Sequence, residues 1–289
     1  MRFTKYAAVI AVAGALVLAG CSGGTTAPED SDAPVAEDVS FEAGTTMAKL
    51  HDAGKITVGT KFDQPLFGLK GLDGNPEGFD VEIAKIIAGE LGIDEGSISW
   101  KEAVSANREP FIENGEVDIV VATYTINDKR KEVISFAGPY YLAGQDILVL
   151  KGNPEGITGV DDIAGKKVCS VTGSTSAQNL KDRGVDVLET DTYSNCLTPL
   201  RQGEVVAVST DNVILAGLAD QNQGEFEVVD NPFTEEPYGI GLKNDDDAFR
   251  AFINDTLEAA FADGRWASAW EKTAGKVLST PTPPTIDRY

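Results

Sequence analysis

Two segments carry residues whose types and spacing could bind an anion. Residues 172–175 (Thr-Gly-Ser-Thr) stand between an expected strand and an expected helix N-terminus, where free backbone N–H groups and the helix dipole favour negative charge. Arg130 stands in a helix that Asn127 is expected to cap, and arginine offers a planar pair of donors to a carboxylate. Each has an ordinary interpretation as well: a turn with a helix cap, and a surface arginine between Lys129 and Lys131. Composition alone favours the surface interpretation of Arg130.

Residues suited to catalysis are sparse. The single histidine, His51, precedes the first expected strand and is interpreted as an exposed helix residue far from any cleft. The sequence has no Ser-His-Asp arrangement, no metal-ligand cluster and no phosphate loop, so we expect no catalytic residue, no metal and no cofactor. Glu235 and Glu236 are interpreted as part of a solvated crossover.

The N-terminus has the pattern of an export signal. Arg2 and Lys5 precede an apolar run at residues 7–18, which fits a secretory signal and is too short to span a bilayer. Residues 18–21 (Leu-Ala-Gly-Cys) resemble the lipobox of bacterial lipoproteins, which implies cleavage after residue 20 and a diacylglyceryl group on Cys21. An ordinary secretory signal with an incidental cysteine stays open. In both cases the folded part lies outside the cytoplasm.

Net charge and cysteine content indicate which partners the protein can bind and in which compartment it folds. The formal net charge of -22 argues against nucleic acid and anionic lipid, because both need a basic surface; the acidity is explained by solubility. Cys169 and Cys196 remain besides Cys21, and we predict that they form a disulfide in an oxidising compartment. A pair of buried free thiols is the alternative.

Strands and helices alternate through the middle of the chain, which predicts an α/β fold with largely parallel sheets. A helix at 80–91 should bury Val81, Ile83, Ile86, Ile87 and Leu91. Expected strands are 55–60, 117–122, 166–171, 185–189 and 205–209, and further helices are expected from residues 127, 174, 193 and 211, and at 245–263 and 265–277.

The alternating strands and helices are expected to form two lobes with a cleft between them, where the carboxyl ends of both sheets converge. Residues 140–150 and 235–242 are the expected crossovers, and the final helices should return to the first lobe. The expected organisation is a signal peptide at 1–20, a flexible tether at 21–44, a first lobe at 45–143 and 236–278, a second lobe at 144–235, and a proline-rich tail at 279–289.

Residues 78–91 (GFDVEIAKIIAGEL) resemble the signature of the family 3 extracellular solute-binding proteins, the polar amino acid receptors of ABC importers. The likeness is closest to the glutamate-binding lipoproteins of actinobacteria, and it implies the type II periplasmic-binding-protein fold. Further matches follow in the family's order at 114–118 (NGEVD), 123–130 (TYTINDKR), 135–141 (SFAGPYY), 173–175 (GST) and 238–239 (YG).

The resemblance implies a ligand site for an amino acid zwitterion. It assigns Arg130 to the ligand α-carboxylate and Asp211 to the α-ammonium, although Asp211 is also a plausible N-cap of the next helix. Thr123 and Thr125 supply a carbonyl and a hydroxyl, with plain β propensity as the alternative. From the second lobe it adds Thr172, Ser174 and Thr175.

The ligand side chain is read by Lys61, Gln64, Ser105 and Arg108 in this resemblance. Glutamine-binding members have an acid where this chain has Lys61, so two cations favour a dicarboxylic ligand by about 2 to 4 kcal/mol; a solvated Lys61 is the alternative. Gln64 and Ser105 replace aromatic residues that often sandwich the ligand. Phe62, Tyr124 or Tyr193 could compensate, and we favour Tyr193.

The sequence therefore predicts a lipid-anchored receptor on the outer face of the cell membrane. It should close on L-glutamate, bind L-aspartate more weakly, act as a monomer, and present its ligand to ABC permease subunits served by a cytoplasmic ATPase. Three alternatives stay open: a receptor for glutamine or asparagine, a sensor that feeds a signalling protein, and an enzyme on the same fold.

Overall fold

The computed structural model describes residues 34–289. The expected signal peptide, Cys21 and most of the expected tether lie outside the described residues. Over the described part, no helix combines the length and apolar character needed to cross a membrane. The first described residues contact the body, because Ala36 N–H donates to Gly89 O at 2.9 Å and the Phe41 ring packs edge-on against Phe252.

The first five-stranded sheet mixes parallel and antiparallel neighbours. β1 runs parallel to β5 and β6, whereas β13 runs antiparallel to β6 and β7. In spatial order its strands are β5 (Ile98–Glu102), β1 (Ile56–Thr60), β6 (Ile119–Val120), β13 (Glu236–Leu242) and β7 (Ser135–Ala143).

The second sheet repeats this plan. β9 runs parallel to β10 and β11, and β8 runs antiparallel to β11 and β12. Its strands in order are β10 (Asp186–Thr190), β9 (Lys167–Val171), β11 (Ala207–Asp211), β8 (Gln145–Leu150) and β12 (Phe226–Val228). The prediction of largely parallel sheets is therefore wrong, because the crossover strands run against the βαβ strands.

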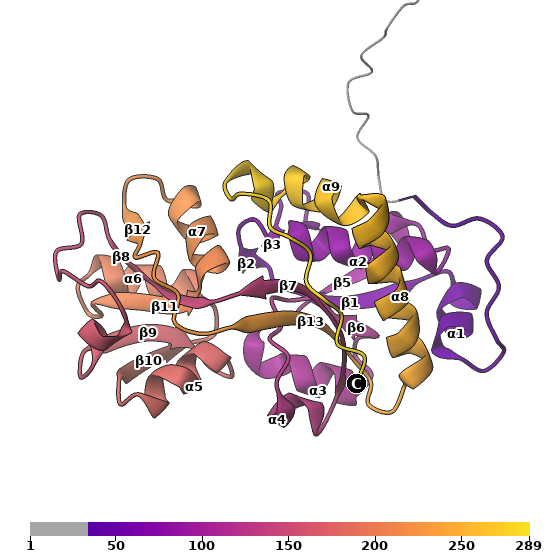
Figure 1. The fold of residues 1–289 in the computed structure, drawn as a ribbon, viewed down its shortest axis with the longest axis horizontal. Helices are drawn as coiled ribbons and strands as arrows, with labels where there is room; N and C mark the ends of the chain where they lie inside the picture. The colour runs from indigo at the N-terminus through magenta and orange to yellow at the C-terminus, as the bar shows by residue number, and fades with distance from the viewer. Residues whose placement is uncertain (1–33) are drawn as a thin grey trace, which may run out of the picture. The chain divides into compact units, whose positions relative to one another are not determined.

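Two strands carry the chain between the sheets. β7 ends at Ala143 and β8 begins at Gln145, and the chain returns through β13, which pairs with β7 (Figure 1). A small third sheet follows β1 in the chain and consists of β2 (Asp63–Gln64), β3 (Gly68–Lys70) and β4 (Pro76–Glu77).

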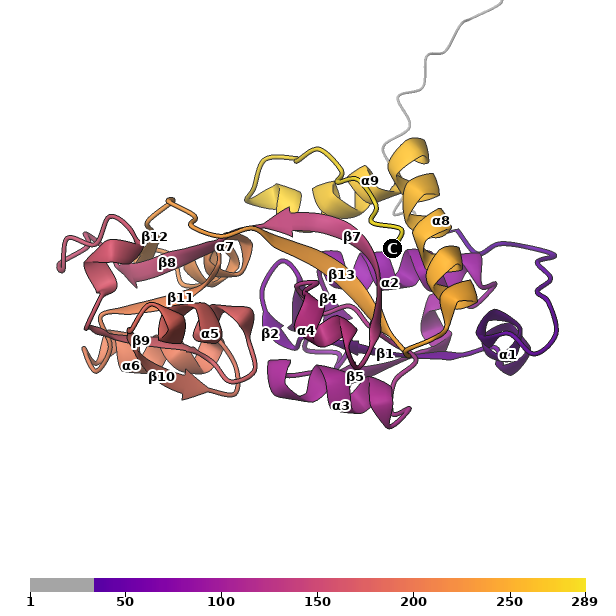
Figure 2. The ribbon, with the colours of Figure 1, turned by 60° about the horizontal axis from the view of Figure 1, so that its bottom comes forward.

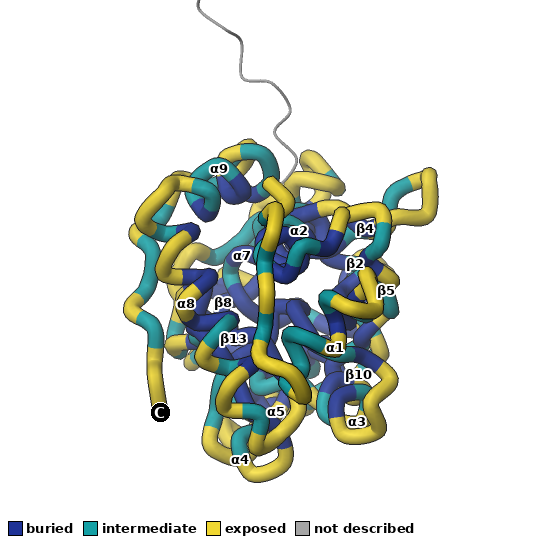
Figure 3. The backbone as a smooth tube through the Cα atoms, turned by 90° about the vertical axis from the view of Figure 1, so that its right-hand side faces the viewer, coloured by how far each residue is buried: buried dark blue, intermediate teal, exposed yellow. Residues whose placement is uncertain are grey.

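Helices cover both faces of the first sheet. α2 (Phe79–Glu90), α8 (Asp247–Asp263) and α9 (Arg265–Lys272) lie on one face, and α3 (Arg108–Glu113) and α4 (Asp128–Lys131) lie on the other (Figures 1 and 2). α2 is buried along most of its length (Figure 3), as its pattern predicts; Trp266 and Trp270 of α9 pack against Phe79 at its start. The remaining helix near this sheet is α1 (Thr46–Ala53).

The second sheet lies between α5 (Thr175–Asp182) on one face and α6 (Leu197–Arg201) with α7 (Asn212–Gln221) on the other. Cys169 of β9 and Cys196 form a disulfide, as predicted. The helix expected from residue 193 begins as a short 3₁₀ turn, Ser194–Cys196, before α6. The strand expected at 117–122 is reduced to the two residues of β6.

The C-terminal segment packs on the first lobe. α8 and α9 contact α2, as expected. Residues 279–289 have no regular structure; Asp287 N–H donates to Gly138 O at 2.8 Å and Arg288 forms an ion pair with Asp255. His51 is half-buried rather than exposed, since its Nδ1 lies 2.8 Å from Leu91 O and its ring meets Phe41.

Candidate functional site

Most residues of the predicted site come together between the two sheets. They surround a narrow, almost filled cavity of about 10 Å³, which the segments after β5 and β6 line from the first lobe and the segments after β9, β10 and β11 line from the second. The residues that line it are Ser105, Arg108, Thr123, Thr125, Ser174, Thr175, Ser176, Tyr193, Asp211 and Ile214. Among the predicted site residues, Lys61, Gln64, Arg130 and Thr172 do not line this cavity.

Arg130 stands at the edge of the cavity and links the two lobes. Asn127 caps α4 by accepting from Arg130 N–H at 2.9 Å, as predicted. The guanidinium donates to Thr125 O at 2.6 Å and to Gly173 O of the second lobe at 3.2 Å, and its Nε pairs with Glu109 at 3.1 Å. Burial and the nearby Arg108 lower the pKa of Arg130 to about 10, so it stays charged at neutral pH.

Asp211 places a carboxylate on the second-lobe side of the cavity. It occupies the N-cap position of α7, but its side chain caps no N–H group. Instead, Oδ2 accepts from the Tyr238 hydroxyl at 2.6 Å, while the buried Oδ1 has no partner within the described residues. Burial and Glu236 raise the pKa of Asp211 to about 7. An unpaired buried acceptor of this kind suits an ammonium donor.

Lys61 is buried at 3 % exposure, which removes the interpretation of a solvated surface lysine. Its Nζ donates to Ser105 Oγ at 2.9 Å, and among residues 34–289 no carboxylate lies within ion-pair distance of it. Burial and Arg108 lower the pKa of Lys61 to about 7. Ser105 lines the cavity, so Lys61 lies one hydrogen bond behind the cavity wall.

Arg108 is fixed by backbone carbonyls. It donates to Ser105 O at 3.3 Å, Ala122 O at 3.1 Å and Thr123 O at 3.3 Å. The guanidinium lies 4.1 Å from the centre of the Tyr124 ring, which supports it through a cation–π contact. Arg108 therefore presents a positive charge to the cavity in a fixed position.

The segment after β6 is held by a buried acid that we did not predict as a site residue. Thr123 has a φ of 44°, which is unfavourable for a β-branched residue. Its N–H donates to Asp80 of α2 at 2.8 Å and its hydroxyl donates to Gln64 Oε1 at 2.9 Å. Asp80 also accepts from Tyr140 at 2.6 Å, so α2 fixes the strained turn that carries Thr123 and Thr125.

The loop 172–175 has the structure that was predicted, but one of its members does not face the cavity. Ser174 caps α5 by accepting from Ala177 N–H at 2.9 Å, and Ser174 and Thr175 line the cavity. Thr172 is exposed and lines neither this cavity nor the groove described next.

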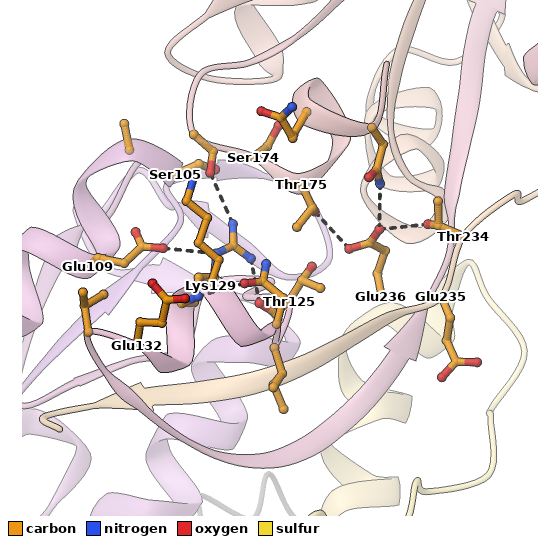
Figure 4. Close-up of a pocket in the computed structure, with 18 residues that line it drawn as sticks. Ser105, Glu109, Thr125, Lys129, Glu132, Ser174, Thr175, Thr234, Glu235 and Glu236 are labelled. Atoms are coloured by element: carbon orange, nitrogen blue, oxygen red, sulfur yellow. Dashed lines mark hydrogen bonds and ion pairs between the residues drawn. The ribbon is translucent and has the colours of Figure 1, made fainter. Parts of the chain in front are cut away.

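A wider groove opens beside Arg130, lined by Ser105 and Glu109 of the first lobe and by Ser174 of the second (Figure 4). Glu236 lies at its other end, where the side chains of Thr175 and Thr234 point toward it and Glu235 points away. Glu236 is 3 % exposed, so its interpretation as a solvated crossover residue is wrong. Pairing of β13 with β7 turns it inward, and Thr175, Thr234 and Asn179 donate to it.

Of the three aromatic residues considered as ligand contacts, one lines the cavity and two lie against cationic side chains. Tyr193 is buried and lines the cavity. Tyr124 lies behind the arginines, with its ring 4.1 Å from Arg108 and 4.9 Å from Arg130, and Phe62 lies under Lys70. Of the three aromatic candidates, Tyr193 is the one at the cavity.

Sequence reasoning missed Asp80, Glu109, Tyr238 and Glu236. Asp80 and Tyr238 lie in segments that carry the family resemblance, so the motif itself contained the signal. Glu109 follows Arg108 directly, and its pairing with Arg130 depends on how α3 and α4 pack. No local pattern shows that contact.

Comparisons with known proteins show which family this chain belongs to. Residues 56–276 match the family of bacterial extracellular solute-binding proteins, family 3. The chain is 42% identical over 273 residues to the glutamate-binding protein GluB of Corynebacterium efficiens, with 91% of this chain and 88% of that protein covered. It is 41% identical over 231 residues to the ABC transporter glutamine-binding protein GlnH of Bacillus subtilis, covering 78% of this chain and 84% of that protein.

Solved structures show the same fold. An ancestral arginine-binding protein bound to glutamine matches with a TM-score of 0.71 and 36% identity, covering 76% of this chain and 97% of the other. A solute receptor for L-cysteine of Neisseria gonorrhoeae matches with a TM-score of 0.75 and 28% identity, covering 81% and 96%. The type II periplasmic-binding-protein fold is thereby confirmed, and the chain belongs to family 3 of the bacterial extracellular solute-binding proteins.

Proposed function

We propose that this protein is a lipid-anchored extracytoplasmic receptor that binds L-glutamate, and L-aspartate more weakly, and delivers it to an ABC importer. The observation that carries the proposal is the set of charges around one interlobe cavity. Arg108, Arg130 and Lys61 supply three cations, and Asp211 offers a carboxylate oxygen without a partner within the described residues. This set is complementary to two carboxylates and one ammonium.

Each ligand group has an assigned partner in the proposal. Arg130 takes the α-carboxylate together with N–H groups at the start of α5, and Asp211 takes the α-ammonium. Arg108 and Lys61 face the distal carboxylate, with Lys61 reaching it beside Ser105. Thr123, Thr125, Gln64 and Tyr193 complete the walls. Thr172 is exposed and its backbone N–H donates to Thr190 O at 3.0 Å, so the proposal gives it no contact with the ligand.

Ligand contacts from both lobes favour the closed form, because closure is a population shift driven by differential affinity. The closed form is the one presented to the permease. The lipid on Cys21 keeps the receptor at the membrane; mass spectrometry of the native N-terminus tests it, and a mature chain with an unmodified Cys21 contradicts it.

A receptor for glutamine is the second candidate, because the relative GlnH is named a glutamine-binding protein and is nearly as similar as GluB. Competition calorimetry with L-glutamate and L-glutamine separates the two. We expect a preference for glutamate of about 2 to 4 kcal/mol, since the amide leaves buried cations without an anion. A tenfold preference for glutamine excludes the glutamate assignment.

A further inference from the structure

α7 of the second lobe lies against the first lobe at Gly217. A Cβ atom added to Gly217 would lie 2.4 Å from the carbonyl oxygen of Pro65 and 3.3 Å from Pro65 Cβ. Pro65 directly follows Gln64 in the turn between β2 and β3. The obstructing atom belongs to the backbone, which cannot rotate away as a side chain would. A side chain at residue 217 would therefore force α7 or the turn that carries Pro65 to shift.

The helix itself gives no reason for this glycine. Gly217 lies inside α7 and its φ is not among the positive values of the chain, so alanine fits its backbone conformation. Glycine is a poor helix former compared with alanine. The cost of glycine at this position is explained by the contact with Pro65.

Neighbouring contacts show that the same turn is seated on the second lobe. Asp63 accepts from Ser194 N–H at 3.4 Å. Leu66, next to Pro65, has a φ of 74°, a conformation that costs energy and persists only where the surroundings fix it. The turn carries Gln64, which accepts from Thr123 inside the site. Its position therefore connects α7 with the ligand-binding residues.

A second close approach occurs at the other side of the cavity. A Cβ atom on Gly173 would lie 2.8 Å from Ala106 Cα of the first lobe. Gly173 has a φ of 77° and its carbonyl accepts from Arg130, so a substitution there would also disturb the backbone and the site. Gly217 makes no such contact and is the cleaner position to test.

We propose that Gly217 is a positioning residue for the bound amino acid, because its missing side chain lets the 63–67 turn dock on α7 when the lobes close. The proposal rests on the proposed receptor function but is independent of the preference for glutamate. It predicts that Gly217→Ala blocks full closure although no residue that touches the ligand is replaced.

The experiment compares Gly217→Ala with wild type and with Gly96→Ala as a matched control. Gly96 has an ordinary φ and open space around its Cβ position, and it lies away from the cavity. Stopped-flow kinetics with L-glutamate, and separately with L-glutamine, gives association and dissociation rates. Small-angle scattering at saturating ligand gives the radius of gyration, and calorimetry gives the melting temperature without ligand.

We expect Gly217→Ala to raise the dissociation rate by about tenfold or more, since the closed population that retains the ligand falls, and to leave association nearly unchanged. Its radius at saturation should exceed that of wild type, whereas Gly96→Ala should match wild type in both. The melting temperature without ligand should equal or exceed that of wild type, because alanine favours the helix.

The proposal is overturned if Gly217→Ala has the dissociation rate and the radius of gyration of wild type. It is also overturned if Gly217→Ala has a lower melting temperature without ligand, because the contact with Pro65 would then stabilise the ligand-free fold as well. A Gly217→Val variant should release ligand faster still; slower release than in Gly217→Ala contradicts the steric argument. If wild type binds neither amino acid, the proposed receptor function fails, and this is decided on wild type before any variant.

Discussion

Replacing Lys61 by methionine tests how the site distinguishes a carboxylate from an amide. Lys61 is buried, donates to Ser105 Oγ at 2.9 Å, and has no ion-pair partner within residues 34–289. Methionine is a flexible, unbranched side chain of similar length that removes the charge. The distal carboxylate of glutamate then loses one of its two cations, and Arg108 alone remains.

The expected magnitude follows from burial and pKa. Removing one member of a buried ion pair costs about 3 to 5 kcal/mol. Lys61 must be charged to bind the carboxylate, and with its pKa lowered to about 7, charging it at pH 7 reduces the binding free energy by only about 0.4 kcal/mol. Because Arg108 remains, we expect Lys61→Met to weaken glutamate binding by about 2 to 4 kcal/mol, roughly 30-fold to 1,000-fold in Kd. Glutamine binding should change by less than about threefold on the same argument.

The same substitution should stabilise the ligand-free protein. The pKa of Lys61 is lower in the folded state, from 10.5 to about 7, so folding disfavours the charged form. This destabilisation is fully present below pH 7 and is relieved as pH rises toward 10.5. Lys61→Met should therefore raise the melting temperature most at pH 7 and below, and progressively less at higher pH.

Isothermal calorimetry with both amino acids, and thermal unfolding without them, measure these effects. Lys49→Met is the control, because Lys49 is exposed on α1 and distant from the cavity. Equal losses for glutamate and glutamine would show that Lys61 has a structural role rather than a selective one. Unchanged glutamate affinity would refute the assignment of Lys61 to the distal carboxylate.

Three further predictions concern the clamp around the amino acid backbone. Arg130→Ala should weaken glutamate binding by roughly 3 to 5 kcal/mol, and near wild-type affinity in calorimetry would discard that assignment. Glutamate affinity should peak near pH 7. As pH falls, Asp211 loses its charge because its pKa is raised to about 7, and as pH rises, Lys61 loses its charge because its pKa is lowered to about 7. If the glutamate affinity of Lys61→Met still declines just above pH 7, Lys61 does not cause the loss of affinity at alkaline pH. Tyr238→Phe should weaken the binding of L-glutamate by about tenfold or more, because Tyr238 orients Asp211 and a hydrogen bond to a charged group contributes about 1.5 to 3 kcal/mol. The binding of glutarate, which lacks the ammonium, should be nearly unchanged. Equal losses for both ligands would assign Tyr238 to structure alone.

Local patterns predicted the parts of the fold that depend on local physics. The spacing of apolar residues placed α2 and its buried face correctly, and the capping preference of asparagine placed the start of α4 at Asn127. Cys169 and Cys196 could be paired because the export signal implied an oxidising compartment. The family resemblance indicated most of the residues that line the cavity, although Thr172 is exposed and does not line it.

Features that depend on strand pairing could not be predicted from local patterns. Glu235 and Glu236 are adjacent and identical in type, and only the register of β13 against β7 decides that Glu236 points inward. The bond between Tyr238 and Asp211 joins residues 27 positions apart, and the bond between Lys61 and Ser105 joins residues 44 positions apart. In each case the partner comes from another strand or lobe, and a sequence window holds no signal for it.

A crystal structure of the protein grown with L-glutamate tests the central claim most directly. The account predicts the α-carboxylate on Arg130, the α-ammonium on Asp211 Oδ1, and the distal carboxylate facing Arg108 and Lys61, all within the cavity that Ser105 and Tyr193 line. Glutamate bound elsewhere, or Arg130 and Asp211 turned toward bulk solvent in the complex, would contradict it.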